Sequence, residues 1–524
     1  MNSVSEKIGK YRWVIASLLL FSTTINYMDR NVIGFLKDYF CSPEGFDWSS
    51  SDYSILTSIF TFFYAGFTLV AGWIIDKIGT KVGLAASLIL WSLAGIASAL
   101  MPESLLGKTI TISFGFLGVY TFPWSLVFQS IVRSIFGAGE AGNFPASIKT
   151  VAEWFPKKER ALATGIFNSG SNIGAMICAI FVPWCLLTWS TGPLHGWRMA
   201  FIITGLVGFL WLIFWGLFYA SPKKMLDRGK LKQAEYDYIH SDKDEQQVEI
   251  EEAGKNEKIS WAKMLSYRQT WSFAAGKFMT DGIWWFLLFW LPTYVKQQFC
   301  FGMTKEATTH TVMITNFIVF GVAIIGSIYG GSIPMSFMNR GWETYKARMT
   351  AMLLIAFAPL LLLSTQFMAG YGIVAAIAII CIGGAAHQAW SANLFTTVSD
   401  MFPKKTVGTV TGIGTAFGGI GGVAVQLLAG GLEDHYRFIG VKLAQAQGLI
   451  HETVKTKLKD IKIDNLHDVM ISQSHDALIQ AKDLIAGNVS TAYMIMFTIC
   501  AFAYLIAWVI IKFLVPRHKP ITDL

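Results

Sequence analysis

A few ionisable side chains lie within long apolar stretches of this chain, where a charge is costly and is therefore a functional candidate. They are Asp29, Arg30, Arg133, Glu140, Lys277, Asp281 and His387. An arginine fork binds a carboxylate bidentately and stays charged, whereas a desolvated carboxylate can take up and release a proton. This combination predicts a site that holds an acidic ligand and exchanges protons.

Arg30 and Arg133 are the side chains that we expect to hold the acidic group. Arg133 and Glu140 lie two helical turns apart and so share one face of a helix. A simpler interpretation is that these charges only pair with one another and hold their helices together. Lys277 could equally extend toward the membrane interface, with Asp281 pairing with it one turn further on.

The elements that must position these residues are membrane-spanning helices. Of the 524 residues, 53% are hydrophobic and only 15% are charged, which excludes a soluble enzyme and predicts an all-α polytopic membrane protein. We expect twelve spans, each long enough to cross the bilayer. They lie roughly at 13–35, 52–75, 82–100, 120–145, 160–186, 198–219, 272–295, 311–333, 348–367, 371–396, 408–431 and 491–514.

The net charge of +8 is mainly a signal of orientation. With both termini inside, most Lys and Arg of the short loops fall on the cytoplasmic side, as the positive-inside rule requires. We therefore expect no nucleic-acid partner, and the bilayer is the surface that the chain contacts. The apolar but Gly/Pro-containing segment 101–123 is interpreted either as an extension of the fourth span or as an external interfacial piece.

An internal repeat divides the chain into two halves. VAEWFPKKERALATG (151–165) reappears as VSDMFPKKTVGTVTG (398–412), and GWIIDKIGTKVG (72–83) has a weaker counterpart at 330–348. The repeat predicts two six-helix bundles, 1–220 and 271–524, joined by a charged cytoplasmic linker, 221–270. Such halves place a substrate site at their interface. An external insertion, 432–490, has helix-like apolar spacing and is expected to form short amphipathic helices.

These motifs are similar to those of a known family. GWIIDKIGTKVG resembles the signature loop of the major facilitator superfamily between helices 2 and 3. INYMDR (25–30), the segment 133–175, KFMTDGIWWFLLFWLP (277–292) and AHQAWSANLFTTVSDMFPKK (386–405) resemble the anion:cation symporter family, most of all its bacterial hexuronate (galacturonate/glucuronate) transporters. The resemblance leaves out the linker and the insertion. The second copy of the loop departs from the pattern at 334–339, which puts a symmetric gating contact in doubt.

The resemblance implies roles for the charged residues. Asp29 and Glu140 match positions implicated in proton coupling, and Arg30 and Arg133 match positions implicated in substrate binding.

Three more charged residues, Asp76, Lys77 and Lys81, fall in the signature loop. There the resemblance implies salt bridges that stabilise the outward-open state. Substitutions at these positions are expected to slow turnover more than they weaken binding.

The hydroxyl groups of a sugar acid would need amide, hydroxyl and aromatic partners in a mostly apolar cavity. The expected partners are Tyr27, Tyr64, Asn168, Asn172, His387, Gln388, Trp390, Ser391 and Asn393. The indole of Trp390 could stack on the apolar face of a sugar ring. For each single polar residue the alternative is an interhelical hydrogen bond, worth roughly 0.6 kcal/mol.

The sequence thus predicts a proton-coupled symporter that imports a sugar acid, with a hexuronate as the expected substrate. It is expected to be a monomer in the inner membrane, without a metal or cofactor, and not an enzyme. An aldonate such as galactonate, another organic anion or a sugar phosphate is the alternative substrate. A non-transporting membrane sensor, with 432–490 as its partner surface, is the alternative function.

Overall fold

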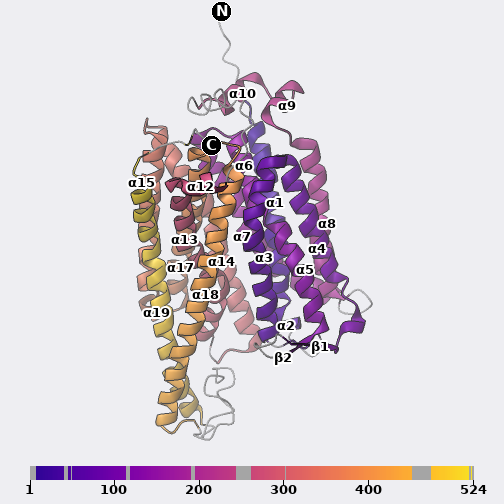
Figure 1. Cartoon of the computed structure of the whole chain (residues 1–524). Helices are drawn as coiled ribbons and strands as arrows, with labels where there is room; N and C mark the ends of the chain where they lie inside the picture. The colour runs from indigo at the N-terminus through magenta and orange to yellow at the C-terminus, as the bar shows by residue number, and fades with distance from the viewer. Residues whose placement is uncertain are drawn as a thin grey trace, which may run out of the picture.

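The computed structural model describes residues 8–40, 45–48, 50–113, 119–189, 195–242, 261–300, 302–450, 474–517 and 521. Its long helices lie side by side along a common axis (Figure 1). The first helix begins, and the last helix ends, at the same end of the molecule, which we call the terminal side. The mostly helical architecture confirms the predicted fold class.

The helices fall into an earlier and a later set along the chain. The N-terminal set is α1 (Tyr11–Phe35), α2 (Lys37–Phe40), α3 (Ser50–Ile78), α4 (Thr80–Ala99), η1 (Glu103–Leu105), α5 (Trp124–Glu140), α6 (Asn143–Trp154), α7 (Lys157–Thr188) and α8 (Gly196–Phe218). The C-terminal set is α13 (Arg268–Phe299), α14 (Lys305–Met338), α15 (Thr344–Phe357), η3 (Ala358–Ser364), α16 (Thr365–Ala369), α17 (Ile373–Met401), α18 (Val407–Ala446) and α19 (His475–Leu514). The domain boundaries at 220 and 270 stay predictions.

Nine helices in the described part of the chain are long and apolar enough to cross a membrane. The predicted spans 13–35, 120–145 and 272–295 are not among them. These three coincide with α1, α5–α6 and α13, the helices that carry the paired charges of the predicted site. The helices α5 and α6 have 17 and 12 residues, so each is too short to cross a membrane alone, whereas charged side chains lower the mean hydropathy of α1 and α13. The count of twelve spans stays a prediction.

Proline interrupts two of the predicted spans. The span 120–145 is divided into α5 and α6 just after Glu140, close to Pro145. In the span 348–367, α15 gives way to the 3-10 helix η3, which has Pro359 in its first turn. Proline has no backbone N–H to donate to the carbonyl four residues earlier, so the α-helical ladder is lost at both places.

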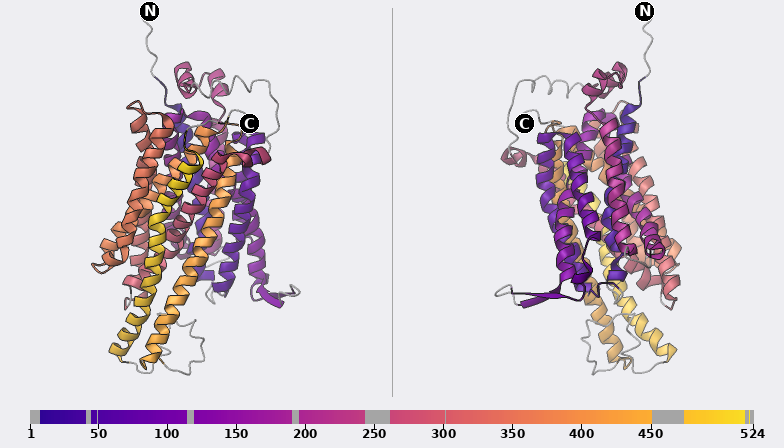
Figure 2. Two further views of the ribbon diagram at one scale, coloured as in Figure 1. Left: turned by 60° about the vertical axis from the view of Figure 1, so that its left-hand side comes forward. Right: turned by 90° about the vertical axis from the view of Figure 1, so that its right-hand side faces the viewer.

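The segment 101–123 does not extend the fourth span. Its second part forms an antiparallel ribbon of β1 (Thr109–Ser113) and β2 (Val119–Pro123), with Thr109 paired to Pro123 and Ser113 to Val119. Alternating Thr and Ile in β1 favour an extended strand over a helix. The ribbon extends sideways from the bundle at the end opposite the terminal side (Figure 2), which agrees with the external alternative.

The prediction of short separate helices in 432–490 is wrong for the residues that the structure describes. Instead, α18 continues to Ala446 and α19 begins at His475, so both spans extend past the bundle as an antiparallel pair (Figure 2). Val441, Ala481 and Ile485 are fully buried in this pair, and Gly440 lies directly against Ile485. Because an apolar face continues along both helices, each further turn buries more side chains between them. Both helices therefore extend past the expected span limits at 431 and 491. Residues 451–473 lie outside the described part.

The linker is described at 221–242 and 261–270, where it forms α9 (Pro222–Asp227), α10 (Gln233–Ile239) and α12 (Trp261–Ser266) and leads into α13. Glu235 of α10 accepts hydrogen bonds from the backbone N–H groups of Tyr11 and Arg12, so it caps the beginning of α1. Tyr238 donates a hydrogen bond to Glu159. Burial, and then the neighbouring Glu159 carboxylate, raise the pKa of Tyr238 to about 12, so this phenol remains a donor at neutral pH.

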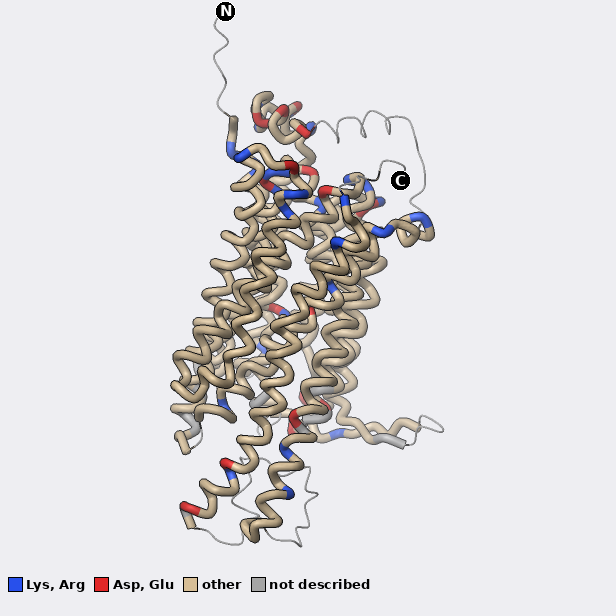
Figure 3. Tube along the Cα trace, turned by 90° about the vertical axis from the view of Figure 1, so that its left-hand side faces the viewer, with Lys and Arg blue, Asp and Glu red and all other residues tan. Residues whose placement is uncertain are grey.

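Lys and Arg gather at the terminal side, whereas the middle of the bundle carries few charges (Figure 3). This distribution is the one that the positive-inside rule gives to a cytoplasmic face. The cytoplasmic position of the termini stays a prediction.

Candidate functional site

A cavity lies between the two sets of helices, at the level of the few charges buried in the bundle. Seven predicted residues line it, namely Tyr27, Arg30, Tyr64, Asn168, His387, Gln388 and Ser391. Its volume of about 60 Å³ holds a few water molecules and is smaller than a six-carbon acid. A ligand of that size therefore enters only when the side chains around the cavity move apart.

Arg30 is the cation of the N-terminal wall of this cavity. Its Nε donates to Glu140 Oε2 at 2.8 Å, and the Glu140 side chain is fully buried. The guanidinium also lies over the rings of Tyr27 and Tyr64, 4.6 Å from each centroid. Stacking on two aromatic rings fixes the plane of the fork, so its orientation is set before any ligand arrives.

Asp29 and Arg133 lie behind the cavity wall, and neither lines it. Each is 2% exposed. Among the described residues, neither oxygen of Asp29 has a hydrogen-bond partner, and the same holds for Nε and Nη2 of Arg133. Arg133 stacks on Phe136 and Phe201, and its charge acts electrostatically on Asp29. The structure therefore contains two neighbouring cation–carboxylate sets on α1 and α5, and only one of them is directly hydrogen-bonded.

Three predicted amide side chains connect the two sets of helices. Asn168 of α7 donates to the Gln388 carbonyl oxygen of α17 at 2.6 Å, and the Gln388 amide donates to Asn172 at 3.5 Å. These hydrogen bonds join the three side chains while the cavity is contracted, but Nδ2 of Asn172 has no partner among the described residues. A ligand with hydroxyl groups could replace these mutual hydrogen bonds.

The remaining predicted residues of α17 lie at different depths. His387 stacks on Trp284 and shares a hydrogen bond of 2.8 Å with the Tyr504 hydroxyl. Trp390 is fully buried against Tyr504 and does not line the cavity. Asn393 is also fully buried and donates to the backbone carbonyls of Gly330 and Ala389. Trp390 and Asn393 thus support α17 from behind the lining.

Lys277 and Asp281 are cavity residues that the sequence left undecided. They lie one turn apart on α13, and their side chains form an ion pair of 2.6 Å. Lys277 is 4% exposed, so it does not extend to the membrane interface, and its ammonium lies 4.1 Å from the centre of the Phe395 ring. The signal in the sequence was the i, i+4 spacing of opposite charges inside an apolar stretch. The C-terminal wall therefore offers a second cation, opposite Arg30.

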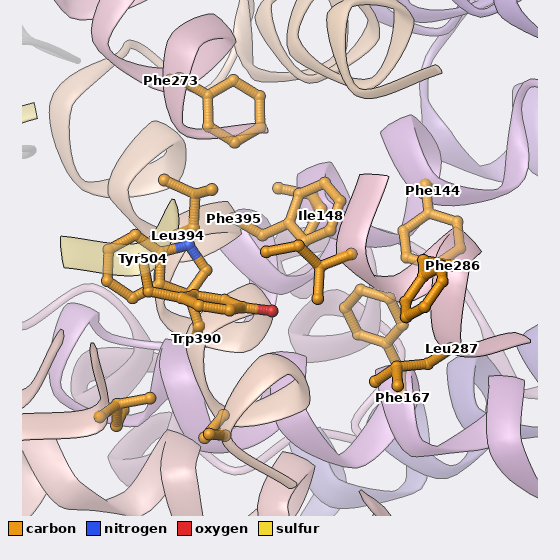
Figure 4. Close-up of a cluster of buried hydrophobic side chains, with 14 of the residues drawn as sticks. Phe144, Ile148, Phe167, Phe273, Phe286, Leu287, Trp390, Leu394, Phe395 and Tyr504 are labelled. Carbon is orange, nitrogen blue, oxygen red and sulfur yellow. The ribbon is translucent and has the colours of Figure 1, made fainter. Parts of the chain in front are cut away.

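An aromatic layer closes the cavity toward the terminal side. Phe144 of α6 stacks on Phe395 of α17 with centroids 5.4 Å apart, and Phe167 and Phe273 pack against this pair (Figure 4). Phe395 follows Ser391, a cavity residue, by one helical turn toward the end of α17. The rings come from both sets of helices, so the layer opens only when the sets separate.

Asp76 makes a charged contact between the two sets at the terminal side. Its carboxylate accepts from the backbone N–H groups of Gly408 and Thr409, and Lys149 pairs with it at 2.9 Å. Gly408 and Thr409 lie in the first turn of α18, whose N–H groups have no partner within the helix and carry partial positive charge. Asp76 therefore caps a helix of the other set. Lys149 is a partner that the sequence analysis did not identify.

Lys77 and Lys81 do not join this contact. Lys77 stacks on Trp73 of its own helix, and Lys81 donates to the backbone carbonyl of Tyr219, at the end of α8. At the matching position of the second half, Gly331 approaches the Ala161 carbonyl as closely as Gly72 approaches that of Gly408. The second loop has no aspartate, and the approach at Gly331 is a contact between backbones.

Two arginines that the sequence analysis missed complete the closure. Arg160 of α7 donates to the Ser399 carbonyl of α17 and lies 3.9 Å from the Asp400 carboxylate. Arg348 of α15 pairs with Asp400 within its own set at 2.7 Å and donates across the sets to the Lys157 carbonyl of α7 at 3.5 Å. Arg160 and Asp400 belong to the two copies of the repeat that contains FPKK. Their position in the repeat was the available signal, but their spacing along the chain does not show that they meet.

Known proteins resemble this chain in sequence and in fold. Residues 19–425 match the family model described as Major Facilitator Superfamily. The chain is 30% identical over 440 residues to a hexuronate transporter of Escherichia coli (strain K12), covering 83% of this chain and 90% of that one. It is 32% identical over 333 residues to a galacturonate transporter of Dickeya chrysanthemi, covering 64% and 84%. Among solved structures, the proton:xylose symporter XylE is 14% identical with a TM-score of 0.62 over 98% of both chains.

Proposed function

We propose, because this chain belongs to the Major Facilitator Superfamily, that it is a proton-coupled symporter that imports a sugar acid, with a hexuronate as its substrate. The observation that carries the proposal is the buried Arg30–Glu140 pair at the cavity wall. The same guanidinium can hold either the Glu140 carboxylate or the carboxylate of a ligand. Relatives named as hexuronate and galacturonate transporters support the substrate class.

The protein is a multi-pass inner membrane transporter and not an enzyme, as the family and the relatives establish. If the termini are cytoplasmic, the closed terminal side is the cytoplasmic side. The Asp76 contact and the aromatic layer then block the cavity from the cytoplasm. We propose that this is the state in which substrate and proton are taken up from outside.

The proton acts through the Arg30–Glu140 pair. When Glu140 takes up a proton, its carboxylate loses the charge that holds Arg30, and the fork becomes available to the substrate carboxylate. Binding of the substrate and protonation of Glu140 are thereby coupled. A protonated Glu140 no longer competes with the substrate carboxylate for Arg30, and an Arg30 that holds the substrate no longer keeps Glu140 in its charged form. Asp29, the neighbour of Arg30 on α1, and Arg133 on α5 supply a further carboxylate and a further cation behind the cavity wall.

The hydroxyl groups of the substrate are met by side chains from both sets of helices. We propose that the bridge between Asn168, Asn172 and Gln388 opens and that its amides turn toward the substrate. Tyr27, Tyr64, His387 and Ser391 line the same space. Because one ligand contacts both sets, its binding can change how the sets sit against each other, which is the requirement of alternating access.

The test is uptake of radiolabelled galacturonate and glucuronate into proteoliposomes, with and without an inward proton gradient. The wild-type protein should accumulate at least one of them only when the gradient is present. Asp29→Asn and Glu140→Gln should abolish gradient-driven accumulation but keep exchange with unlabelled substrate. Arg30→Lys, which keeps the charge but loses the fork, should raise the substrate concentration for half-maximal uptake by about tenfold or more.

Asp227→Asn and Arg268→Lys are matched controls, because both residues are exposed and lie outside the cavity. Accumulation driven by a sodium gradient instead would contradict proton coupling. Absence of uptake of either hexuronate would contradict the substrate, and aldonates and sugar phosphates would be tried next. Saturable binding of a hexuronate without any exchange would favour the sensor.

A further inference from the structure

A second cavity lies at the terminal side, away from the proposed substrate site. Its volume is about 650 Å³. Its lining comes from the end of α3 and the start of α4, from Glu153 of α6 and from the end of α8. The linker adds α9, Arg228 and His240, and the turn between α17 and α18 adds Lys404. Figure 1 shows α9 at this end of the molecule, above α8. The lining of the cavity thus contains residues of both sets of helices and of the linker.

The lining of this cavity is strongly basic. Its described residues include Lys81, Lys223, Lys224, Arg228 and Lys404, whereas Glu153 is the one carboxylate among them.

The Glu153 carboxylate already accepts hydrogen bonds from the hydroxyls of Thr80 and Tyr219. Lys224 and Arg228 lie close enough to repel the ammonium of Lys81 electrostatically. Several like charges around one hollow space create a positive potential that attracts an anion.

The surface beside this cavity is apolar and exposed. Ile78 and Val82, which belong to the lining, are 47% and 57% exposed, and Leu217, two residues before Tyr219, is 60% exposed. All three belong to helices that are long and apolar enough to cross a membrane. A cationic pocket next to lipid-facing side chains matches a molecule with an anionic head and an apolar tail.

We propose that this cavity binds the phosphate-containing headgroup of an anionic phospholipid, with the acyl chains along Ile78, Val82 and Leu217. Basic pockets between spanning helices on the cytoplasmic side are a recognised form of lipid binding. The flexible ammonium groups of Lys223 and Lys224 contact the phosphate as point charges, and Arg228 can hold two of its oxygens. Lys404 comes from the C-terminal set, so a bound lipid favours the state in which the terminal side is closed.

The test measures lipid binding to the purified full-length protein by native mass spectrometry, with phosphatidylglycerol or phosphatidylcholine added in detergent. The wild-type protein should retain phosphatidylglycerol in preference to the zwitterionic lipid. The variant Lys223→Ser/Lys224→Ser/Arg228→Ser should bind phosphatidylglycerol at least about tenfold more weakly, because each Lys or Arg near an anionic lipid contributes roughly a fivefold factor.

Lys230→Ser/Lys232→Ser is the matched control, since both lysines are exposed, lie in the same linker segment and do not line the cavity. A charge-retaining variant, Lys223→Arg/Lys224→Arg/Arg228→Lys, should keep the preference for phosphatidylglycerol and shows that the segment still folds. Equal loss in the triple variant and the control would overturn the proposal. Inorganic phosphate that competes as strongly as phosphatidylglycerol would also overturn it, because the site would then bind a free anion.

This measurement needs neither the transported substrate nor a gradient. The lipid site can therefore fail while the proposed transport function stands, and the reverse also holds. Only the assignment of the lipid to the cytoplasmic leaflet rests on the proposed orientation.

Discussion

The carboxylate of Asp76 accepts two hydrogen bonds from Thr409, one from its backbone N–H and one from its hydroxyl, each at 2.6 Å. The two residues are 333 positions apart and belong to α3 and α18. Asp76 thereby stabilises the positive end of a helix in the other set, where the usual capping residue, Thr406, makes no side-chain cap. The closed state is held by a contact that breaks when the sets separate.

We expect Asp76→Asn to slow transport more than it weakens substrate binding. The amide keeps the size of the side chain but removes the negative charge at the end of α18 and leaves Lys149 without its carboxylate. Loss of one partner from a buried ionic contact is strongly destabilising, so the maximal uptake rate should fall by about tenfold or more. The concentration for half-maximal uptake should change by less than about twofold.

The matched control is Lys77→Gln, at the next position of α3, because the contact that Lys77 makes in the described part of the chain is a stack on Trp73. Its maximal rate should stay within about a factor of two of wild type, since the stack joins two residues of the same helix and is kept when the two sets separate. Equal rates for the two variants would show that the charge at α18 is not what closes the terminal side.

A methyl group at Gly72 should prevent closure of the terminal side. A Cβ placed there would lie 2.2 Å from the Gly408 backbone oxygen, which cannot move without shifting α18. Gly72→Ala should therefore be expressed and folded but should transport at a small fraction of the wild-type rate. Gly66→Ala is the control on the same helix, because a Cβ at Gly66 meets nothing within 4 Å. Wild-type uptake by Gly72→Ala would mean that the two helices do not need this approach.

The Lys277–Asp281 pair should show strong coupling in a double-mutant cycle. Removing one partner leaves the other as an uncompensated buried charge, at a cost of roughly 3–5 kcal/mol, whereas removing both leaves none. Lys277→Met and Asp281→Leu should each lower the thermal unfolding temperature of the purified protein more than the double variant does. Additive losses would indicate that the two charges act independently.

The cap that Glu235 places on α1 should govern the local opening of this end of the helix. Glu235→Gln removes the charge that Arg12 and the two backbone N–H groups share. Hydrogen bonds to charged groups contribute roughly 1.5–3 kcal/mol, so amide hydrogen exchange in 11–15 and 222–239 should become about tenfold faster or more. Asp237→Asn, at an exposed position of the same helix, should leave this exchange unchanged. An unaltered exchange rate in Glu235→Gln would show that the linker is held by other contacts.

Local patterns predicted the helices well and their interruptions poorly. Apolar stretches placed most helices within a few residues of their observed bounds, because burial of apolar side chains and span length are properties of a segment. Two apolar stretches that were predicted as continuous spans are divided, one close to Pro145 and the other at Pro359. The extension of α18 to Ala446 was missed because its stability comes from packing against α19, which is remote in sequence.

The candidate site was predicted in type but only partly in position. Arg30, Asn168 and Gln388 line the central cavity, as expected of a substrate site at the interface of two halves. Trp390 and Asn393 belong to the same stretch of α17 but face its packing partners. Side chains one residue apart on a helix point in directions about 100° apart, and the sequence does not state which direction meets the cavity.

The sequence by itself determined that the chain is a helical membrane protein with internally repeated halves, and it singled out the charged residues. These conclusions follow from residue type and spacing, because an apolar span and a charged side chain within it can be recognised from the sequence alone. The tertiary structure decided which partner each charge has: Glu140 for Arg30, Asp281 for Lys277, and the first turn of α18 for Asp76. Partners from different helices meet only after the helices have packed, so the spacing of residues along the chain does not identify them.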